Sequence, residues 1–264
     1  MMRFTYLCAC IIFLMVISCN DNEAETKNTL PEKEQQLRNL ISRYPDSILL
    51  KENLIQYFRE NGNYGAAIAT TNEALNKDSL NDRYFDIKAT LHFENGDTIN
   101  AIRAFEKAIA INPQPEYIIS LGSLYAQTKD PMALELADAL LQAPAANAQK
   151  QALFIKGLYF SYTGDKIKAL SFFDNCLKMD YRDILAYREK AICLYDLKNY
   201  SEALDVLTKS VAVNNTFDEG YYWMGRCYEK LDKRKEAIAS YQQALQIDPD
   251  YLEAKDALGK LGIK

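Results

Sequence analysis

Few side chains in this sequence are suited to catalysis or metal binding. The chain has one histidine, His92, whereas a zinc site needs three or four ligands. Large aromatic residues, Phe58, Phe160 and Tyr228, stand at the equivalent places when the sequence is laid out with a 34-residue spacing. We therefore predict that His92 packs in the core and binds no metal.

Three cysteines, Cys176, Cys193 and Cys227, fall within predicted helices, at places where small buried side chains are expected. Cys193 and Cys227 are separated by one such spacing, and equivalent positions of stacked helices lie about 8–10 Å apart. This is beyond the roughly 7 Å Cα separation that a disulfide allows. The sequence leaves a disulfide between Cys176 and Cys193 open. Carboxylate pairs such as Asp82 with Asp86 are predicted on solvated helix faces.

The sequence lacks a glycine-rich phosphate loop, a Gly-x-Ser-x-Gly element and a Walker-type lysine. Acidic residues outnumber basic ones, 36 to 31, which disfavours an electrostatic nucleic-acid binder. Hydrophobic residues make up 48% of the chain and charged residues 25%, as in folded globular proteins and unlike disordered ones. We predict a protein that is not an enzyme, needs no cofactor or metal, and binds no nucleic acid.

The N-terminal segment has the pattern of a secretion signal. Arg3 supplies a positive start, and the apolar run that follows is too short to cross about 30 Å of hydrocarbon, which takes roughly 20 residues. The run ends in Val16-Ile17-Ser18-Cys19, which resembles the lipobox of bacterial lipoproteins. This resemblance implies that residues 1–18 are removed and that Cys19 carries a lipid. An ordinary membrane anchor and an uncleaved signal are the alternatives.

Residues 19–29 are polar and have nothing to bury, so we predict a flexible acidic tether. The acidic residues just after Cys19 resemble the export signals of surface lipoproteins in the Bacteroidetes group. The predicted location is the outer membrane of the cell envelope, with the protein either facing the periplasm or displayed on the cell surface.

The rest of the chain, residues 30–263, contains a 34-residue internal repeat. One site of the repeat is small in five places and acidic in one: Ala67, Ala101, Glu135, Ala169, Ala203 and Ala237. Each repeat predicts two helices, and a small residue is expected where two helix backbones approach closely. The predicted repeats are 48–81, 82–115, 116–149, 150–183, 184–217 and 218–251.

The residues within a repeat resemble the tetratricopeptide repeat (TPR) family. In 218–251 the matching residues are Tyr221, Met224, Gly225, Tyr228, Ala237, Tyr241, Ala244 and Pro249. Repeat 116–149 departs from the pattern, since Gly122 lies one place early, Pro131 falls in the turn and Pro144 interrupts the second helix. The resemblance implies an all-α fold, a right-handed α-solenoid of about six helix-turn-helix repeats. Capping helices are predicted over 31–44 and 251–261, because each repeat buries its faces only against neighbours.

By the same resemblance, the first helix of each repeat lines a concave groove for other proteins or peptides. The predicted groove residues are Arg83, Phe93, Phe154, Leu158, Tyr162, Arg188, Tyr195, Tyr222 and Arg226. Aromatic and arginine side chains often dominate the energy of protein interfaces. The alternative for each of these residues is that it packs between repeats.

These features predict a non-enzymatic protein-protein interaction scaffold that is tethered to a membrane of the cell envelope. One alternative is a dedicated subunit of an envelope machine, such as a pilotin-like protein or an outer-membrane barrel-assembly factor. Another is a glycan-capturing surface lipoprotein. The glycan alternative is disfavoured because sugar sites favour stacked tryptophan, and the chain has a single tryptophan.

Overall fold

The computed structural model describes residues 31–142 and 148–263. These residues form fourteen helices and no strand, which confirms the predicted all-α fold. The helices are Glu32–Arg43 (α1), Ile48–Glu60 (α2), Tyr64–Lys77 (α3), Asp82–Glu94 (α4), Thr98–Ile111 (α5), Pro115–Gln127 (α6), Met132–Leu141 (α7), Ala148–Thr163 (α8), Lys166–Met179 (α9), Ile184–Asp196 (α10), Tyr200–Val213 (α11), Asp218–Lys230 (α12), Arg234–Ile247 (α13) and Leu252–Lys260 (α14).

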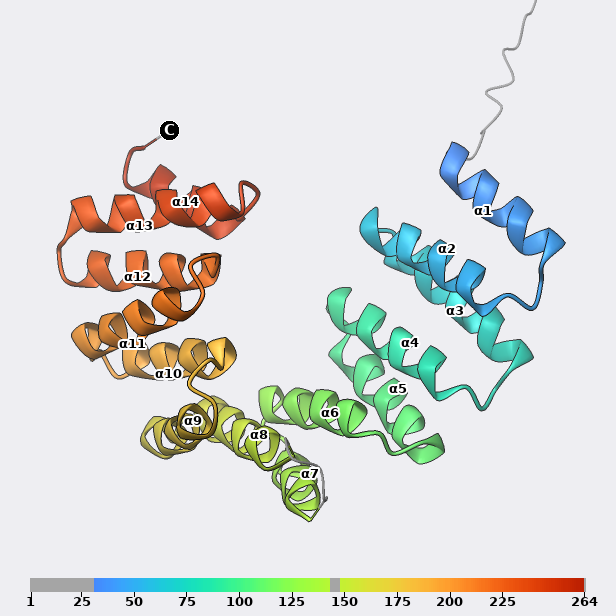
Figure 1. The fold of residues 1–264 in the computed structure, drawn as a ribbon, viewed down its shortest axis with the longest axis horizontal. Coiled ribbons are helices and arrows are strands. Elements are labelled where there is room, and N and C mark those ends of the chain that lie inside the picture. Colours follow the sequence, from blue (N-terminus) through green and yellow to red (C-terminus); the bar gives the residue numbers. More distant parts are fainter. Residues whose placement is uncertain (1–30, 143–147, 264) are drawn as a thin grey trace, which may run out of the picture.

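The helices are arranged as an α-solenoid, as predicted. Each helix packs mainly against its neighbours in the sequence; the exception is α6, which packs on α8 as extensively as on α7. Figure 1 shows the helix pairs following one another around an open arc, with α6 to α8 at its middle and α1 and α14 at its two ends. The chain therefore has several consecutive hydrophobic clusters instead of one central core.

The turn between the two helices of a repeat contains a residue with positive φ. Gly62, Gly96 and Gly164 occupy this place, with φ of 67°, 78° and 99°. Lys198 and Asp232 occupy it in the last two repeats, with φ of 64° and 58°. Glycine adopts this conformation without strain, which explains why it recurs at the 34-residue spacing.

An Asn or Asp side chain then caps the second helix in several repeats. The side-chain oxygens of Asn63, Asp97 and Asp165 each accept a hydrogen bond, 3.1 Å long, from the backbone N–H three residues further on. Such a cap satisfies one of the free N–H groups at a helix start and typically contributes about 1 kcal/mol. The short sequence of turn residue and cap therefore fixes where the second helix begins.

The repeated alanines lie where helices make their closest contacts. The side chains at five of the six sites have no exposed surface: Ala67, Ala101, Ala169, Ala203 and Ala237. The facing first helix is equally crowded, since a Cβ added to Gly157 would lie 2.6 Å from Cε1 of Phe173. Because these sites have no free volume, only Ala and Gly fit them.

The third repeat departs from the regular pattern, as its sequence indicates. The 34-residue spacing placed the close-contact site at Glu135, but Glu135 is exposed and the buried small residues are Ala133 and Ala137. The positive-φ residue, Lys129, also comes one place early, although α7 begins at Met132 and so keeps the 34-residue spacing from Thr98 of α5. Helix α7 has only ten residues and buries small alanine side chains, so α6 packs directly on α8. The contact is close, because a Cβ added to Gly122 of α6 would lie 2.7 Å from Cδ1 of Ile155 of α8.

Two further helices cover the ends of the solenoid. α1 packs on α2, and α14 packs on α13 with Ala257 and Leu258 buried. The predicted signal at 1–18, the tether at 19–29, and Pro144 lie outside the described residues. None of the helices in the described part of the chain combines the length and the apolar character needed to cross a bilayer.

Candidate functional site

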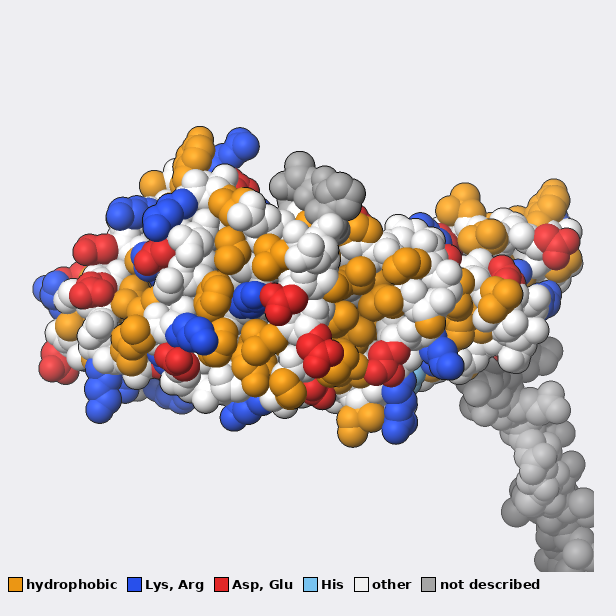
Figure 2. Space-filling model, turned by 90° about the horizontal axis from the view of Figure 1, so that it is seen from below, with side chains coloured by type: hydrophobic (Ala, Val, Ile, Leu, Met, Phe, Trp, Pro, Cys, Tyr) orange, Lys and Arg blue, Asp and Glu red, His pale blue; other side chains and the backbone are white. Residues whose placement is uncertain are grey.

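Three hollows are lined mainly by the first helices of the repeats. One, of about 330 Å³, lies between α2 and α4. The other two, of about 470 and 490 Å³, share Tyr222 and Glu253 and are lined by residues of α8, α10, α12 and α14. The first helices therefore present an N-terminal hollow and a C-terminal pair of hollows. In Figure 2, a view of the molecule from below, hydrophobic side chains lie among charged side chains of both signs.

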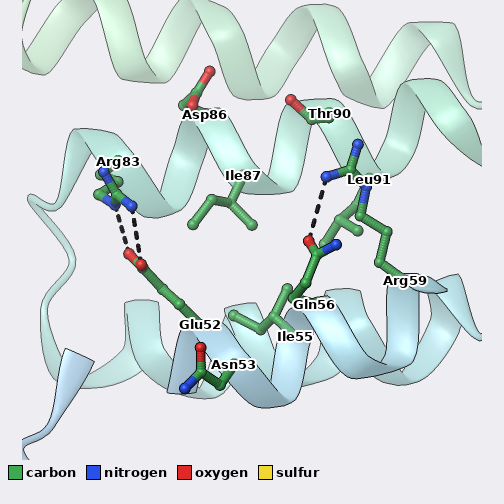
Figure 3. A pocket seen from close by; sticks show the side chains of 10 residues that line it. All are labelled: Glu52, Asn53, Ile55, Gln56, Arg59, Arg83, Asp86, Ile87, Thr90 and Leu91. Carbon is green, nitrogen blue, oxygen red and sulfur yellow. Dashed lines mark hydrogen bonds and ion pairs between the residues drawn. The ribbon is translucent and has the colours of Figure 1, made fainter. Parts of the chain in front are cut away.

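The N-terminal hollow is polar, and its arginines are occupied by carboxylates of the chain itself. Arg83 donates from Nε and Nη2 to the two carboxylate oxygens of Glu52, at 2.5 and 2.9 Å (Figure 3). Arg59 pairs with Glu94 and donates to Oε1 of Gln56 at 3.4 Å. Arg83, a predicted groove residue, is thus held in an ion pair across α2 and α4.

One carboxylate of this hollow, Asp86, forms no ion pair among the described residues. It lies with Thr90 on the side of α4 that is turned away from α2 (Figure 3). Burial raises the pKa of Asp86; the positive charge of Arg83 opposes this rise and the negative charge of Asp82 adds to it. An acidic ligand would be repelled by Glu52 and Asp86, so the hollow is poorly suited to a carboxylate.

The first C-terminal hollow brings together three predicted groove residues from three helices. Tyr162 of α8, Arg188 of α10 and Tyr222 of α12 all line it. Arg188 donates to Glu189 at 3.0 Å and to Glu219 at 2.8 Å, so its charge is compensated within the hollow. Tyr162 leaves 41% of its surface exposed, and burial of the rest raises the pKa of its hydroxyl.

The second C-terminal hollow is built around Arg226. Its guanidinium lies 5.3 to 5.8 Å from the ring centroids of Tyr195, Tyr222 and Trp223. It donates hydrogen bonds to the hydroxyls of Tyr222 and Tyr195, at 3.0 and 3.2 Å. Burial lowers the pKa of Arg226, but these hydrogen bonds outweigh it and the pKa is raised, so the group stays charged. No carboxylate of the described residues pairs with it.

Two aromatic residues of this region were missed by the sequence prediction. Trp223 lies 5.4 Å from Tyr195 and 5.8 Å from Tyr222 between ring centroids. Tyr251, which precedes α14, lies 5.2 Å from Tyr222. Trp223 directly follows the predicted groove residue Tyr222, so the sequence could have indicated it. Tyr251 belongs to the capping segment, to which the repeat pattern assigns no groove residue.

Two predicted groove residues, Phe154 and Leu158, line none of the three hollows. Leu158 is buried, with 4% of its surface exposed. Phe154 packs edge-on against Phe173, with 5.8 Å between ring centroids, in the cluster between α8 and α9. Because α8 packs on α6, α7 and α9, Leu158 is almost fully covered and Phe154 is covered in part. Phe93 is 44% exposed but lines none of the three hollows.

The cysteines are buried in the repeats and free. The Sγ atom of Cys176 lies 3.6 Å from the carbonyl oxygen of Lys150, and that of Cys193 lies 3.3 Å from Oγ of Ser161. The disulfide between Cys176 and Cys193 that the sequence left open is therefore not formed. Among the described residues, no group of three or more His, Cys, Asp or Glu side chains could hold a metal ion.

Two models of the tetratricopeptide repeat match the sequence, at residues 83–115 and 219–251. Each match begins one residue inside a helix pair of the solenoid and covers both of its helices, α4 with α5 and α12 with α13. The chain is a TPR protein.

Curated relatives share the TPR pattern at low identity. Tetratricopeptide repeat protein 1 of Schizosaccharomyces pombe is 26% identical over 202 residues, which is 67% of this TPR chain and 18% of that protein. Stress-induced-phosphoprotein 1 of Caenorhabditis elegans is 24% identical over 165 residues, 62% of this chain and 49% of that protein. The chain thus spans less than half the length of these relatives.

Solved structures with a similar fold include two proteins of comparable size. A TPR protein from Parabacteroides merdae superposes with a TM-score of 0.71 at 19% identity, covering 86% of this chain and 90% of that one. PilW, described as a type IV pilus biogenesis factor, gives a TM-score of 0.60 at 18% identity, covering 79% of this chain and 97% of that one. At this identity the similarity establishes a shared fold.

Proposed function

We propose that this TPR protein is a protein-binding scaffold of the cell envelope, held at a membrane by a lipid on Cys19. The TPR fold supports protein–protein interaction in general. The observation that carries the more specific proposal is the cluster of aromatic and arginine side chains in the C-terminal hollows, represented by Tyr162, Tyr222 and Arg226. The hydrophobic clusters of the repeats leave these side chains partly exposed.

The C-terminal hollows have the chemistry of a binding hot spot. Tyr162 offers a large apolar ring with a polar end, which buries much surface for little lost rotamer freedom. Arg226 is already held by two tyrosine hydroxyls, so ordering it on binding costs little. Because those bonds use only some of its five N–H donors, others remain for the backbone carbonyls of a bound segment.

The partner that fits best is an extended protein segment with apolar or aromatic side chains. Such a segment would cross α8, α10 and α12 and place its side chains in the two hollows. Arg188 is paired with Glu189 and Glu219, so its charge is not free to attract a partner. We therefore infer that apolar contacts, more than long-range charge attraction, provide most of the affinity.

The proposed membrane attachment rests on the lipobox-like segment Val16-Ile17-Ser18-Cys19. The whole chain has a formal net charge of −5, which does not favour binding to anionic lipid surfaces. A covalent lipid would therefore be needed to hold it at a membrane. The outer membrane is the proposed location, with the periplasm-facing and surface-displayed orientations both compatible with the tether.

The experiment is site-specific photocross-linking in intact envelopes. A photoreactive residue at Tyr162 should capture partners, whereas one at Ile167, which is 68% exposed on α9 and lines none of the three hollows, should not. Several captured proteins support the scaffold, and one stoichiometric protein supports the envelope-machine alternative. Equal capture from both positions, or capture of glycan only, would contradict the proposed binding surface.

A further inference from the structure

A fourth cavity, away from the three hollows above, has a distinct chemical character. It has a volume of about 490 Å³ and lies between α3, α4 and α5. Its lining residues are Ile68, Asn72, Phe85, Lys88, His92, Asn100, Arg103, Ala104 and Lys107. Two of the three helices, α3 and α5, are second helices of repeats, so this cavity does not belong to the proposed partner-binding surface.

The lining of this cavity contains three cationic side chains and no carboxylate. The three hollows on the first helices, and a further cavity beside α1 that is lined by Glu73, each contain at least one Asp or Glu. The absence of a carboxylate is unexpected in a chain whose formal net charge is −5. The cavity is therefore a local concentration of positive charge on an acidic protein.

The three cations of the cavity lack ionic partners within the described residues, and the one hydrogen bond that they make there runs from Arg103 to Oδ1 of Asn100, at 3.2 Å. Lys88, Arg103 and Lys107 form no ion pair there, whereas Lys156 pairs with Asp138 at 2.6 Å. Three other lysines form ion pairs in the same way: Lys150, Lys166 and Lys190. These lysines are half-buried, as is Lys88, whereas Arg103 and Lys107 are exposed. Charges gathered without counter-charges repel one another, a cost that a bound anion would remove.

Three further polar side chains complete the lining, those of Asn72, His92 and Asn100. Nδ1 of His92 is buried and makes no hydrogen bond, although Oδ2 of Asp97 lies 3.3 Å away. That oxygen instead accepts from the side-chain amide of Asn100 at 2.7 Å, while Oδ1 caps α5. The amide of Asn72 also lines the cavity. The site thus offers the amide of Asn72 beside its cations, and the imidazole of His92 lines it with Nδ1 next to Asp97.

We propose that this cavity binds the phosphate group of an anionic ligand. A phosphate monoester carries a charge of about −1.5 to −2 and three acceptor oxygens, which matches three cations and neighbouring donors better than a single carboxylate does. Arg103 supplies a planar guanidinium, which can bind an oxyanion through two parallel hydrogen bonds. Ile68 and Phe85 supply an apolar wall for the rest of the ligand. A free phosphate ester and a phospholipid headgroup share this chemistry.

The test compares two charge-matched double variants of the chain from Asn20 onward, which retains every described helix and lacks the lipid site. R103Q/K107Q removes two exposed cations of the cavity. K51Q/K77Q, the control, removes two cations from the cavity beside α1 that contains Glu73. Circular dichroism establishes that both variants fold. Calorimetry then measures the binding of pyrophosphate, and flotation measures binding to phosphatidylcholine vesicles with and without phosphatidylglycerol.

Pyrophosphate should bind the parent chain and the control alike, and R103Q/K107Q should weaken it about tenfold or more. Binding of pyrophosphate alone identifies a soluble phosphate ester as the ligand source, whereas added binding to phosphatidylglycerol vesicles identifies a headgroup. The proposal is overturned if neither probe binds, if both double variants weaken binding equally, or if an acidic peptide without phosphate displaces pyrophosphate at equal concentration.

Discussion

Gly225 of α12 and Tyr241 of α13 face each other so closely that a Cβ added to the glycine would lie 2.5 Å from Cε1 of the ring. The ring has no room to move, since Tyr241 has no exposed surface and its hydroxyl is hydrogen-bonded to Glu229. The same relationship joins Gly157 to Phe173 two repeats earlier. In these two repeats, the large ring on the second helix faces a residue without a side chain on the first.

Gly225→Ala should lower the free energy of unfolding by about 1–3 kcal/mol, because the added methyl forces two packed helices apart. Gly259→Ala is the control: this helical glycine of α14 has no atom within 4 Å of its added Cβ, so helix propensity should stabilise the variant by up to about 1 kcal/mol. Urea unfolding followed by Trp223 fluorescence and circular dichroism measures both. Equal changes in the free energy of unfolding for the two variants would show that the helices adjust around a methyl group at Gly225 without cost.

Ala237→Leu should also destabilise the solenoid, by roughly 1–3 kcal/mol, since Ala237 is completely buried between helices. Glu135→Leu, at the equivalent place by 34-residue spacing, should have much less effect because Glu135 is exposed. Ala133→Leu should behave like Ala237→Leu, since Ala133 has no exposed surface. Thermal unfolding ranks the three variants. Similar shifts for the Glu135 and Ala237 variants would contradict the shifted packing of α7.

Y162A/Y222A should weaken binding of the cross-linked partner by at least about 2 kcal/mol, roughly thirtyfold. Tyr181→Ala, at a residue 68% exposed between α9 and α10, should leave the affinity unchanged. Calorimetry on the purified chain measures this at low and moderate salt. Affinity should change little with salt, because Arg188 is already paired. Binding that depends strongly on salt and is unaffected by Y162A/Y222A would show that the partner binds outside the C-terminal hollows.

Cys19→Ala should release the protein from membranes and leave the solenoid folded. Cys19 is the residue to which the lipobox-like sequence assigns the lipid, and the described helices do not depend on it. Metabolic labelling with a palmitate analogue followed by membrane fractionation measures both effects. Absence of label on the unsubstituted protein would rule out the lipid attachment.

The buried thiols should be unreactive in the folded protein. Burial raises the pKa of Cys176 and of Cys227 from the ordinary 9.0 to about 12. At mildly alkaline pH a thiol reagent should modify them only after unfolding. Because the folded state holds the proton more tightly, this contribution to stability is complete below about pH 9 and is lost as the pH rises toward 12. Rapid labelling of native protein, with stability unchanged across this range, would contradict the burial.

The 34-residue pattern predicted the repeat, the helix pairs and, in five of the six repeats, the places of closest contact. These features are local: Gly225, Ala237 and Tyr241 meet within one repeat, so their spacing is visible in the chain. The same holds for the turn, where a positive φ and a capping side chain recur at the same place in several repeats. Local geometry and steric limits act on neighbouring residues, so a linear pattern carries them.

Which side chains of the first helices remain exposed depends on how the repeats pack against one another. Leu158 and Tyr162 are one helical turn apart on α8, yet α8 is covered where Leu158 lies and open at Tyr162. The environment of Arg226 depends on Tyr195, a full repeat earlier in the chain. These contacts depend on the angle at which one repeat stacks on the next. Many side chains set that angle together, and no short sequence pattern records it.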